Sequence, residues 1–189
     1  MRQRLGFWSK LIIIFAILAV IFMFFRLSRR SVTMLCDTSF NLAYPDDALK
    51  DFRKALARES CNLKIVTMTS RTLTEEQALK DILSRYSDNA LVLTTPVVSL
   101  AIEIAGIDLS QMTSGLAVGM ASESSSYFDI VLPADLESLP DGTYYTDAIG
   151  MENVENLVYP DLAQSVIPLL KLDKENLSIA EGVMVYGVK

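Results

Sequence analysis

An uninterrupted apolar run from Leu11 to Phe25 constrains this chain more than any other feature. As an α-helix its 15 residues would extend about 22 Å, which is short for a bilayer core of about 30 Å. The flanks lengthen the helix, because 21 residues separate Arg4 from Arg26 and Lys10 is the only charged residue among them. A lysine near a helix end can extend its ammonium to the interface. The sequence therefore predicts one membrane-spanning helix.

We interpret residues 1–30 as an uncleaved, single-pass signal-anchor, with residues 5–27 in contact with the membrane. A cleaved signal peptide has a similar basic start and apolar centre, but residues 26–30 (RLSRR) lack the small residues of a cleavage site. A lipoprotein signal is the third interpretation, since Cys36 follows the run. Leu35, directly before that cysteine, is larger than such signals favour. The flanking residues therefore favour the uncleaved anchor.

The orientation of the anchor does not follow from the balance of charge, because three basic residues lie on each flank of the apolar run. A short basic tail ahead of a single apolar helix usually stays in the cytoplasm. We therefore expect residues 31–189 to lie outside the cytoplasm, in a periplasmic compartment. No second apolar stretch of spanning length follows in the sequence.

The composition excludes several kinds of chemistry. The chain has no histidine, which rules out a Ser-His-Asp or Cys-His catalytic arrangement and any histidine-containing zinc site. Two cysteines, Cys36 and Cys61, cannot form a disulfide framework. The helix expected between them separates them by roughly 20 Å, whereas a disulfide needs Cα atoms within about 7 Å, so we expect two reduced, buried thiols. The sequence also lacks a Gly-rich phosphate loop and an EF-hand loop, so we expect no cofactor and no metal.

The charge of the chain is strongly asymmetric. Residues 31–189 contain all 23 acidic residues and 11 of the 17 basic ones, which gives them a formal charge of −12. Between Arg85 and Lys171 there are 12 acidic residues and no basic one. Such a surface repels phosphate backbones, so we exclude nucleic acid as a partner. A solubilising surface, or attraction of cations or a basic partner, explains the acidic excess.

Apolar runs alternate with helical patterns after the anchor. Near-continuous apolar strands joined by helices indicate parallel crossovers in a sheet that is covered on both faces. The sequence therefore predicts a single α/β domain over residues 31–189, built as a three-layer sandwich with a mostly parallel sheet. The expected strands are 32–36, 63–68, 90–94, 115–120 and 128–132, and the expected helices are 45–58, 74–86 and 97–105.

The expected second helix has the clearest local signals. Thr74 is its predicted N-cap, because Gln77 follows three residues later as in a capping box, and Leu73 can pack on Ala78. The last third of the chain is less regular. It contains a turn signal over residues 139–143, a short helix expected over 161–170 and a final strand expected over 179–188.

Polar residues follow the expected strands at the places where parallel α/β sheets bind ligands, outside the carboxyl ends of the strands. Hydroxyls and one carboxylate there can hydrogen-bond a small polar molecule. Ser, Thr and Asp at such places also cap the following helices, and this simpler explanation stays open. The predicted ligand-binding residues are Asp37, Thr38, Ser39, Thr94, Thr95 and Ser122.

Three further patterns are weaker. The neighbouring tyrosines 144 and 145 lie beside Asp141 and Asp147, a combination that can bind sugars or cations but more often reflects packing. Asp37 and Asp129 are the acidic residues that we consider as an acid/base pair, although the sequence sets no distance between them. The small residues in the segment 115–119 (GLAVG) indicate tight packing of a strand or turn.

The order strand, Asp-Thr-Ser-Phe-Asn (residues 37–41), helix, strand, helix, Ala-Leu-Val-Leu-Thr-Thr (residues 90–95) resembles the first lobe of type I periplasmic binding proteins. The resemblance covers residues 31–135. It implies a solute-binding or sensing module with Asp37 and Ser39 near the ligand. In that family two such lobes clamp the ligand between them.

These observations lead to one hypothesis and two alternatives. The hypothesis is a non-enzymatic, membrane-anchored α/β domain outside the cytoplasm that binds a small polar solute or a protein partner. The first alternative is a hydrolase that uses carboxylates, because histidine and nucleotide motifs are absent from the sequence. The second is a structural subunit of a membrane complex.

Overall fold

The fold is that of a computed structural model of the whole chain. The chain divides into two compact units, Met1–Arg30 and Ser31–Lys189. The structure describes residues 6–27, 30–38, 40, 44–121, 125–134, 142–146, 158–175 and 177.

The first unit contains the helix α1 (Phe7–Leu27), 21 residues long. Most of its described apolar side chains are exposed to solvent, from Trp8 to Met23. Within this described part of the chain, no helix is both long and apolar enough to be counted as a membrane span.

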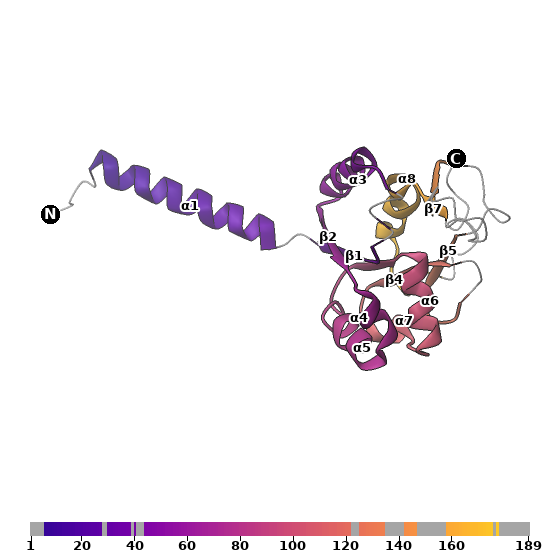
Figure 1. Cartoon of the computed structure of the whole chain (residues 1–189). Helices are drawn as coiled ribbons and strands as arrows, with labels where there is room; N and C mark the ends of the chain where they lie inside the picture. Colours follow the sequence, from indigo (N-terminus) through magenta and orange to yellow (C-terminus); the bar gives the residue numbers. More distant parts are fainter. Residues whose placement is uncertain are drawn as a thin grey trace. The chain divides into compact units, whose positions relative to one another are not determined.

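The second unit is an α/β fold built on a five-stranded sheet (Figure 1). The strand order is β2-β1-β3-β4-β5, and β1, β3, β4 and β5 pair in parallel. The α/β class and the parallel sheet that the sequence predicts are therefore confirmed. The strands of this sheet are β1 (Arg30–Cys36), β2 (Cys61–Thr67), β3 (Leu91–Thr94), β4 (Leu116–Ala121) and β5 (Ile130–Pro133).

Helices lie on both faces of the sheet (Figure 1), which is consistent with the predicted three-layer sandwich. One face packs against α3 (Asp46–Arg58), α8 (Leu162–Val166) and the 3₁₀-helix η1 (Ile167–Lys171). The other face packs against α4 (Ser70–Thr74), α5 (Glu76–Ser84), α6 (Pro96–Ile104) and α7 (Leu109–Met112). A short hairpin of β6 (Tyr144–Thr146) and β7 (Val158–Pro160) completes the described elements.

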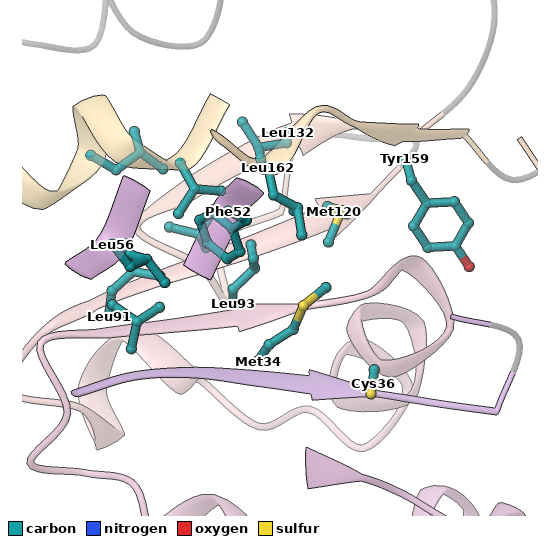
Figure 2. Close-up of a cluster of buried hydrophobic side chains, with 14 of the residues drawn as sticks. Met34, Cys36, Phe52, Leu56, Leu91, Leu93, Met120, Leu132, Tyr159 and Leu162 are labelled. Carbon is teal, nitrogen blue, oxygen red and sulfur yellow. The ribbon is translucent and has the colours of Figure 1, made fainter. Parts of the chain in front are cut away.

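Alternation along the strands divides the buried side chains between two cores. Met34 of β1 and Leu93 of β3 belong to the first core, under α3 and α8, whereas Leu35 and Val92 belong to the second, under α5 and α6. Successive side chains of a strand point to opposite faces, so a strand buried on both faces must be apolar throughout. Figure 2 shows the first core, where residues of α3 and α8 cover the sheet: Phe52, Leu56 and Leu162 above Met34, Leu91, Leu93 and Met120.

The predicted start of the second helix is wrong. Thr74 is not an N-cap but the last residue of the extra helix α4, where its hydroxyl donates back to the carbonyl oxygens of Ser70 (3.2 Å) and Arg71 (3.1 Å). Helix α5 begins one residue later than a Thr74 cap would require, with Glu75 as its N-cap and no side-chain cap bond. A threonine hydroxyl inside a helix commonly bonds back to the preceding turn, and that competes with capping.

The other expectations on secondary structure have mixed outcomes. The structure also shows a cap that was not predicted from the sequence: the Asp161 carboxylate accepts a hydrogen bond of 3.1 Å from the Gln164 amide at the start of α8. The short helix expected over 161–170 is present as α8 followed by η1. The final strand expected over 179–188 and most of the turn expected over 139–143 lie outside the described residues. Both cysteines are buried thiols that form no disulfide, as the sequence predicts.

Candidate functional site

The carboxyl ends of β1 and β3 bring Asp37 and Thr95 together. Each residue directly follows its strand, and the register pairs Leu35 with Thr94. The Thr95 hydroxyl donates a hydrogen bond of 2.8 Å to Asp37 Oδ1. Asp37 is 7% exposed and Thr95 is fully buried. Two of the predicted ligand-binding residues, 58 positions apart in the sequence, therefore form one buried polar pair.

This pair lies at the point where the connections of the sheet change sides. The chain leaves β1 for α3, which packs on one face, and leaves β3 for α6, which packs on the other. In open parallel sheets such a divergence separates the loops at the carboxyl edge and creates a crevice where ligands bind. Asp37 and Thr95 thus occupy the topological switch point of the sheet.

Helix capping explains the position of Thr69, which follows β2, but not that of Thr95, which follows β3. The Thr69 side chain accepts a hydrogen bond from the Thr72 amide (3.4 Å) and so caps α4. Thr95 is the N-cap residue of α6, but its side chain makes no cap bond. The Thr95 hydroxyl donates to Asp37 instead. Its backbone carbonyl oxygen accepts the first hydrogen bond of α6, from the Ser99 amide at 2.8 Å.

The hydroxyl of Thr94 makes hydrogen bonds inside the folded domain. Its side chain is fully buried, its hydroxyl lies 2.7 Å from the Ser99 hydroxyl, and it donates to the Val118 carbonyl oxygen at 3.4 Å. These contacts tie the first turn of α6 to β3 and β4. Thr94 therefore has a structural role at this edge, and its buried hydroxyl is not placed to bind a ligand.

The remaining predicted site residues have different positions. Thr38 is exposed, next to Asp37. Ser39 and Ser122 lie outside the described residues. Ser99 was not predicted from the sequence, because nothing in an apolar helical pattern indicates that its hydroxyl faces the preceding strand.

Cys36 lies directly before Asp37 and is not an activated nucleophile. Burial has the largest effect and raises the pKa of its thiol; the hydrogen bond with the Thr67 hydroxyl at 3.6 Å lowers the pKa by less, and the negative charge of Asp37 adds a still smaller increase. The thiolate is the nucleophilic form of cysteine, so a raised pKa keeps this group inert at neutral pH. Its contacts with Thr67 and the Val66 carbonyl oxygen (3.6 Å) indicate a packing role.

The acid/base pair of Asp37 and Asp129 considered from the sequence is wrong. Asp129 precedes β5, and its Oδ2 atom accepts a hydrogen bond of 2.8 Å from the amide of Ala117, near the start of β4. Because the strands are parallel, Asp129 lies at the amino edge of the sheet and Asp37 at the carboxyl edge. Two carboxylates at opposite edges cannot act on the same substrate atom.

The tyrosines of β6 are placed partly by packing. The ring of Tyr145 lies 5.3 Å from that of Tyr44, which also packs against Phe40 (4.9 Å) and Tyr159 (5.3 Å). The Tyr44 hydroxyl donates to the Pro160 carbonyl oxygen at 2.6 Å. This aromatic cluster explains Tyr145 without a ligand. Asp141 and Asp147 lie outside the described residues.

A metal site has no support in the part of the chain that the structure describes. No group of three or more cysteine, aspartate or glutamate side chains there is arranged to hold a metal ion. No family model matches the chain, and no curated protein matches its sequence significantly.

Proposed function

We propose that the α/β domain binds a small polar solute at the carboxyl edge of its sheet, around Asp37 and Thr95. The observation that supports this most strongly is their hydrogen bond of 2.8 Å at the switch point of the sheet. Burying a carboxylate costs free energy unless hydrogen bonds compensate for the lost water. A buried carboxylate at the edge where parallel sheets bind ligands therefore favours a binding role.

The chemistry of the pair favours a ligand with hydrogen-bond donors. An ionised carboxylate is an acceptor only, with about four lone-pair positions on its two oxygens. Thr95 donates to Oδ1 and so orients the carboxylate. Hydroxyl or ammonium groups of a solute are matched to such an acceptor, and the exposed side chain of Thr38 adds a group that can donate or accept.

Binding is favoured over catalysis by what surrounds the pair. The neighbouring thiol of Cys36 has a raised pKa, and Asp129 lies at the other edge of the sheet. The resemblance of residues 31–135 to one lobe of type I periplasmic binding proteins also favours a solute-binding module. A protein partner at the same edge is the alternative that stays open if the solute screen below is negative.

The test is a thermal-shift screen of the full chain in detergent against sugars, polyols and amino acids. A solute present at 100 times its Kd is expected to stabilise the protein by about 2.7 kcal/mol. Asp37→Asn should abolish the shift, whereas Asp88→Asn, a change at an exposed carboxylate near the amino edge, should leave it unchanged. If no solute shifts the melting temperature, or if both variants respond alike, the solute-binding proposal is wrong.

The second part of the proposal is that residues 1–30 hold the domain at a membrane, with residues 31–189 in an extracytoplasmic compartment. It is supported by the apolar sequence of α1 and by the exposure of its side chains from Trp8 to Met23, which water solvates poorly. The protein should stay with membranes after a carbonate wash and keep its N-terminus by intact-mass measurement. A reporter fused after Lys189 that is active only in the cytoplasm would reverse the proposed orientation.

A further inference from the structure

The side chain of Lys174 ends among three oxygen atoms. Its ammonium nitrogen donates hydrogen bonds to the carbonyl oxygens of Ser110 and Thr113, the second at 2.7 Å. It also lies 3.6 Å from Asp129 Oδ2. The side chains of Lys174 and Asp129 are 31% and 10% exposed, so the ion pair is better shielded from water than an ordinary surface pair.

All three oxygens are held in place by the fold. Ser110 is the second residue of the four-residue helix α7 and Thr113 is its C-cap, and the last four residues of a helix have carbonyl oxygens without intrahelical donors. Asp129 is fixed by the hydrogen bond that its carboxylate accepts from the Ala117 amide at 2.8 Å. These oxygens therefore form a cage around the Lys174 ammonium, which we call the amino-edge cage.

Lys174 reaches this cage from the other layer of the sandwich. It follows η1, whose Leu169 and Leu170 belong to the core under α3 and α8. The cage oxygens of Ser110 and Thr113 come from the layer on the opposite face, where Leu109 belongs to the second core. The lysine thus joins the two helical layers around the amino edge of the sheet.

We propose that the amino-edge cage is a binding site for a primary ammonium group and that Lys174 is its tethered, resident cation. Two main-chain carbonyl oxygens and a carboxylate oxygen are hydrogen-bond acceptors, and an ammonium group has three N–H donors. The occupied cage acts as a latch that keeps the segment after η1 attached to α7 and β5. It lies at the edge opposite Asp37 and Thr95, so its test is independent of the proposed solute site.

The first test is hydrogen exchange on the full chain in detergent, comparing Lys174→Met with Lys171→Met. Lys171 is exposed and lies three residues earlier, so it controls for the loss of one charge from the same segment. In Lys174→Met, amide exchange in residues 109–117 and 169–175 should rise together by about tenfold, while β1 and β3 keep their protection. Equal exchange in the two variants would disprove the latch.

The second test is chemical rescue of Lys174→Ala. This change removes three carbon atoms and the ammonium, the atoms that n-propylammonium contains. Millimolar n-propylammonium should restore most of the lost protection in residues 109–117, and tetramethylammonium, which has no N–H donor, should not. If both cations act alike, the effect is one of ionic strength and the cage is not an ammonium site.

A third variant keeps the proposal testable if the lysine variants fold poorly. Asp129→Asn retains an acceptor for the Ala117 amide but removes the negative charge near Lys174. Exchange should then rise in residues 169–175 more than in β4. Unchanged exchange in residues 169–175 would show that the carboxylate does not hold the lysine.

Discussion

The ring of Phe128 covers the backbone of Gly119 so closely that a Cβ atom at this glycine would lie 2.8 Å from the ring carbons Cγ and Cδ2. Gly119 lies within β4 with an ordinary strand backbone, and its φ is not in the positive range that favours glycine. The glycine is needed for space alone. The sequence pattern of small residues over 115–119 reflects this tight packing, as expected.

Gly119→Ala should therefore destabilise the domain by about 1–3 kcal/mol, the usual cost of overpacking a well-packed core. Because the obstacle is a side chain, the double variant with Phe128→Leu should recover part of that loss, and urea unfolding of the single and double variants measures it. Additive effects of the two changes would show that the clash with Phe128 is not the cause.

Gly115 offers the matched contrast. A Cβ atom there would lie 2.1 Å from the Asn89 carbonyl oxygen and 2.3 Å from that of Ala90, and both are backbone atoms. Gly115→Ala should destabilise the domain more than Gly119→Ala, because no side-chain substitution can relieve the contact. Thermal unfolding compares the two variants directly, and an equal or smaller effect at Gly115 would contradict the prediction.

Strands β1, β3 and β4 were predictable because their side chains are buried on both faces. Residues 32–36 and 91–94 are apolar apart from threonines, and a covered parallel sheet requires this pattern. The start of α5 was not predictable from its capping signal. Thr74 and Gln77 satisfy the spacing of a capping box, yet the hydroxyl of Thr74 bonds within the preceding helix α4. Local spacing does not decide between these two bonds.

The candidate site was predictable only in part. Asp37 and Thr95 each follow an apolar run, so the sequence places both at the carboxyl edge of a parallel sheet. Their direct hydrogen bond depends on β1 lying next to β3, and this order follows from long-range packing rather than from any local signal. The error for Asp129 has another cause, because a residue near the start of the expected strand 128–132 lies at the amino edge of a parallel sheet, opposite Asp37, whatever the order of the strands.

Replacing Thr95 tests how much the buried pair contributes to stability. Thr95→Val keeps the shape of the side chain but removes the donor to Asp37 Oδ1. Loss of one partner of a buried charged group should cost about 1–3 kcal/mol in urea unfolding at neutral pH. Thr38→Val, at the exposed neighbour of Asp37, should change stability by less than about 0.5 kcal/mol. Similar losses in both variants would show that the pair has no special role.

Both thiols should resist modification in the folded protein. Cys36 is fully buried with a raised pKa, and Cys61 is 3% exposed, with its thiol 3.4 Å from the Glu59 carbonyl oxygen. A thiol-reactive disulfide reagent should modify neither residue within minutes at neutral pH and both after denaturation in guanidinium. Rapid modification of Cys36 in the native protein would show that the end of β1 opens readily.

The raised pKa of the buried Tyr44 phenol should make the stability of the domain depend on pH in the alkaline range. Burial raises the pKa of its phenol well above the usual value, and neighbouring Tyr159 and Asp161 raise it further. The folded state therefore keeps this proton at pH values where the unfolded chain, with a tyrosine pKa of about 10, loses it. Because the unfolded state binds fewer protons above that pH, stability is fully present below about pH 10 and falls as the pH rises toward the folded-state pKa.

Urea unfolding between pH 8 and pH 11 measures this loss, and Tyr44→Phe is the comparison. The variant should be less stable at pH 8, because the hydrogen bond of 2.6 Å to the Pro160 carbonyl oxygen is lost. Its stability should then fall less steeply above pH 10 than that of the wild type. The pKa of Tyr145 is also raised by burial, so a smaller decline should persist in the variant. Parallel curves for the two proteins across this range would rule out Tyr44 as the group responsible.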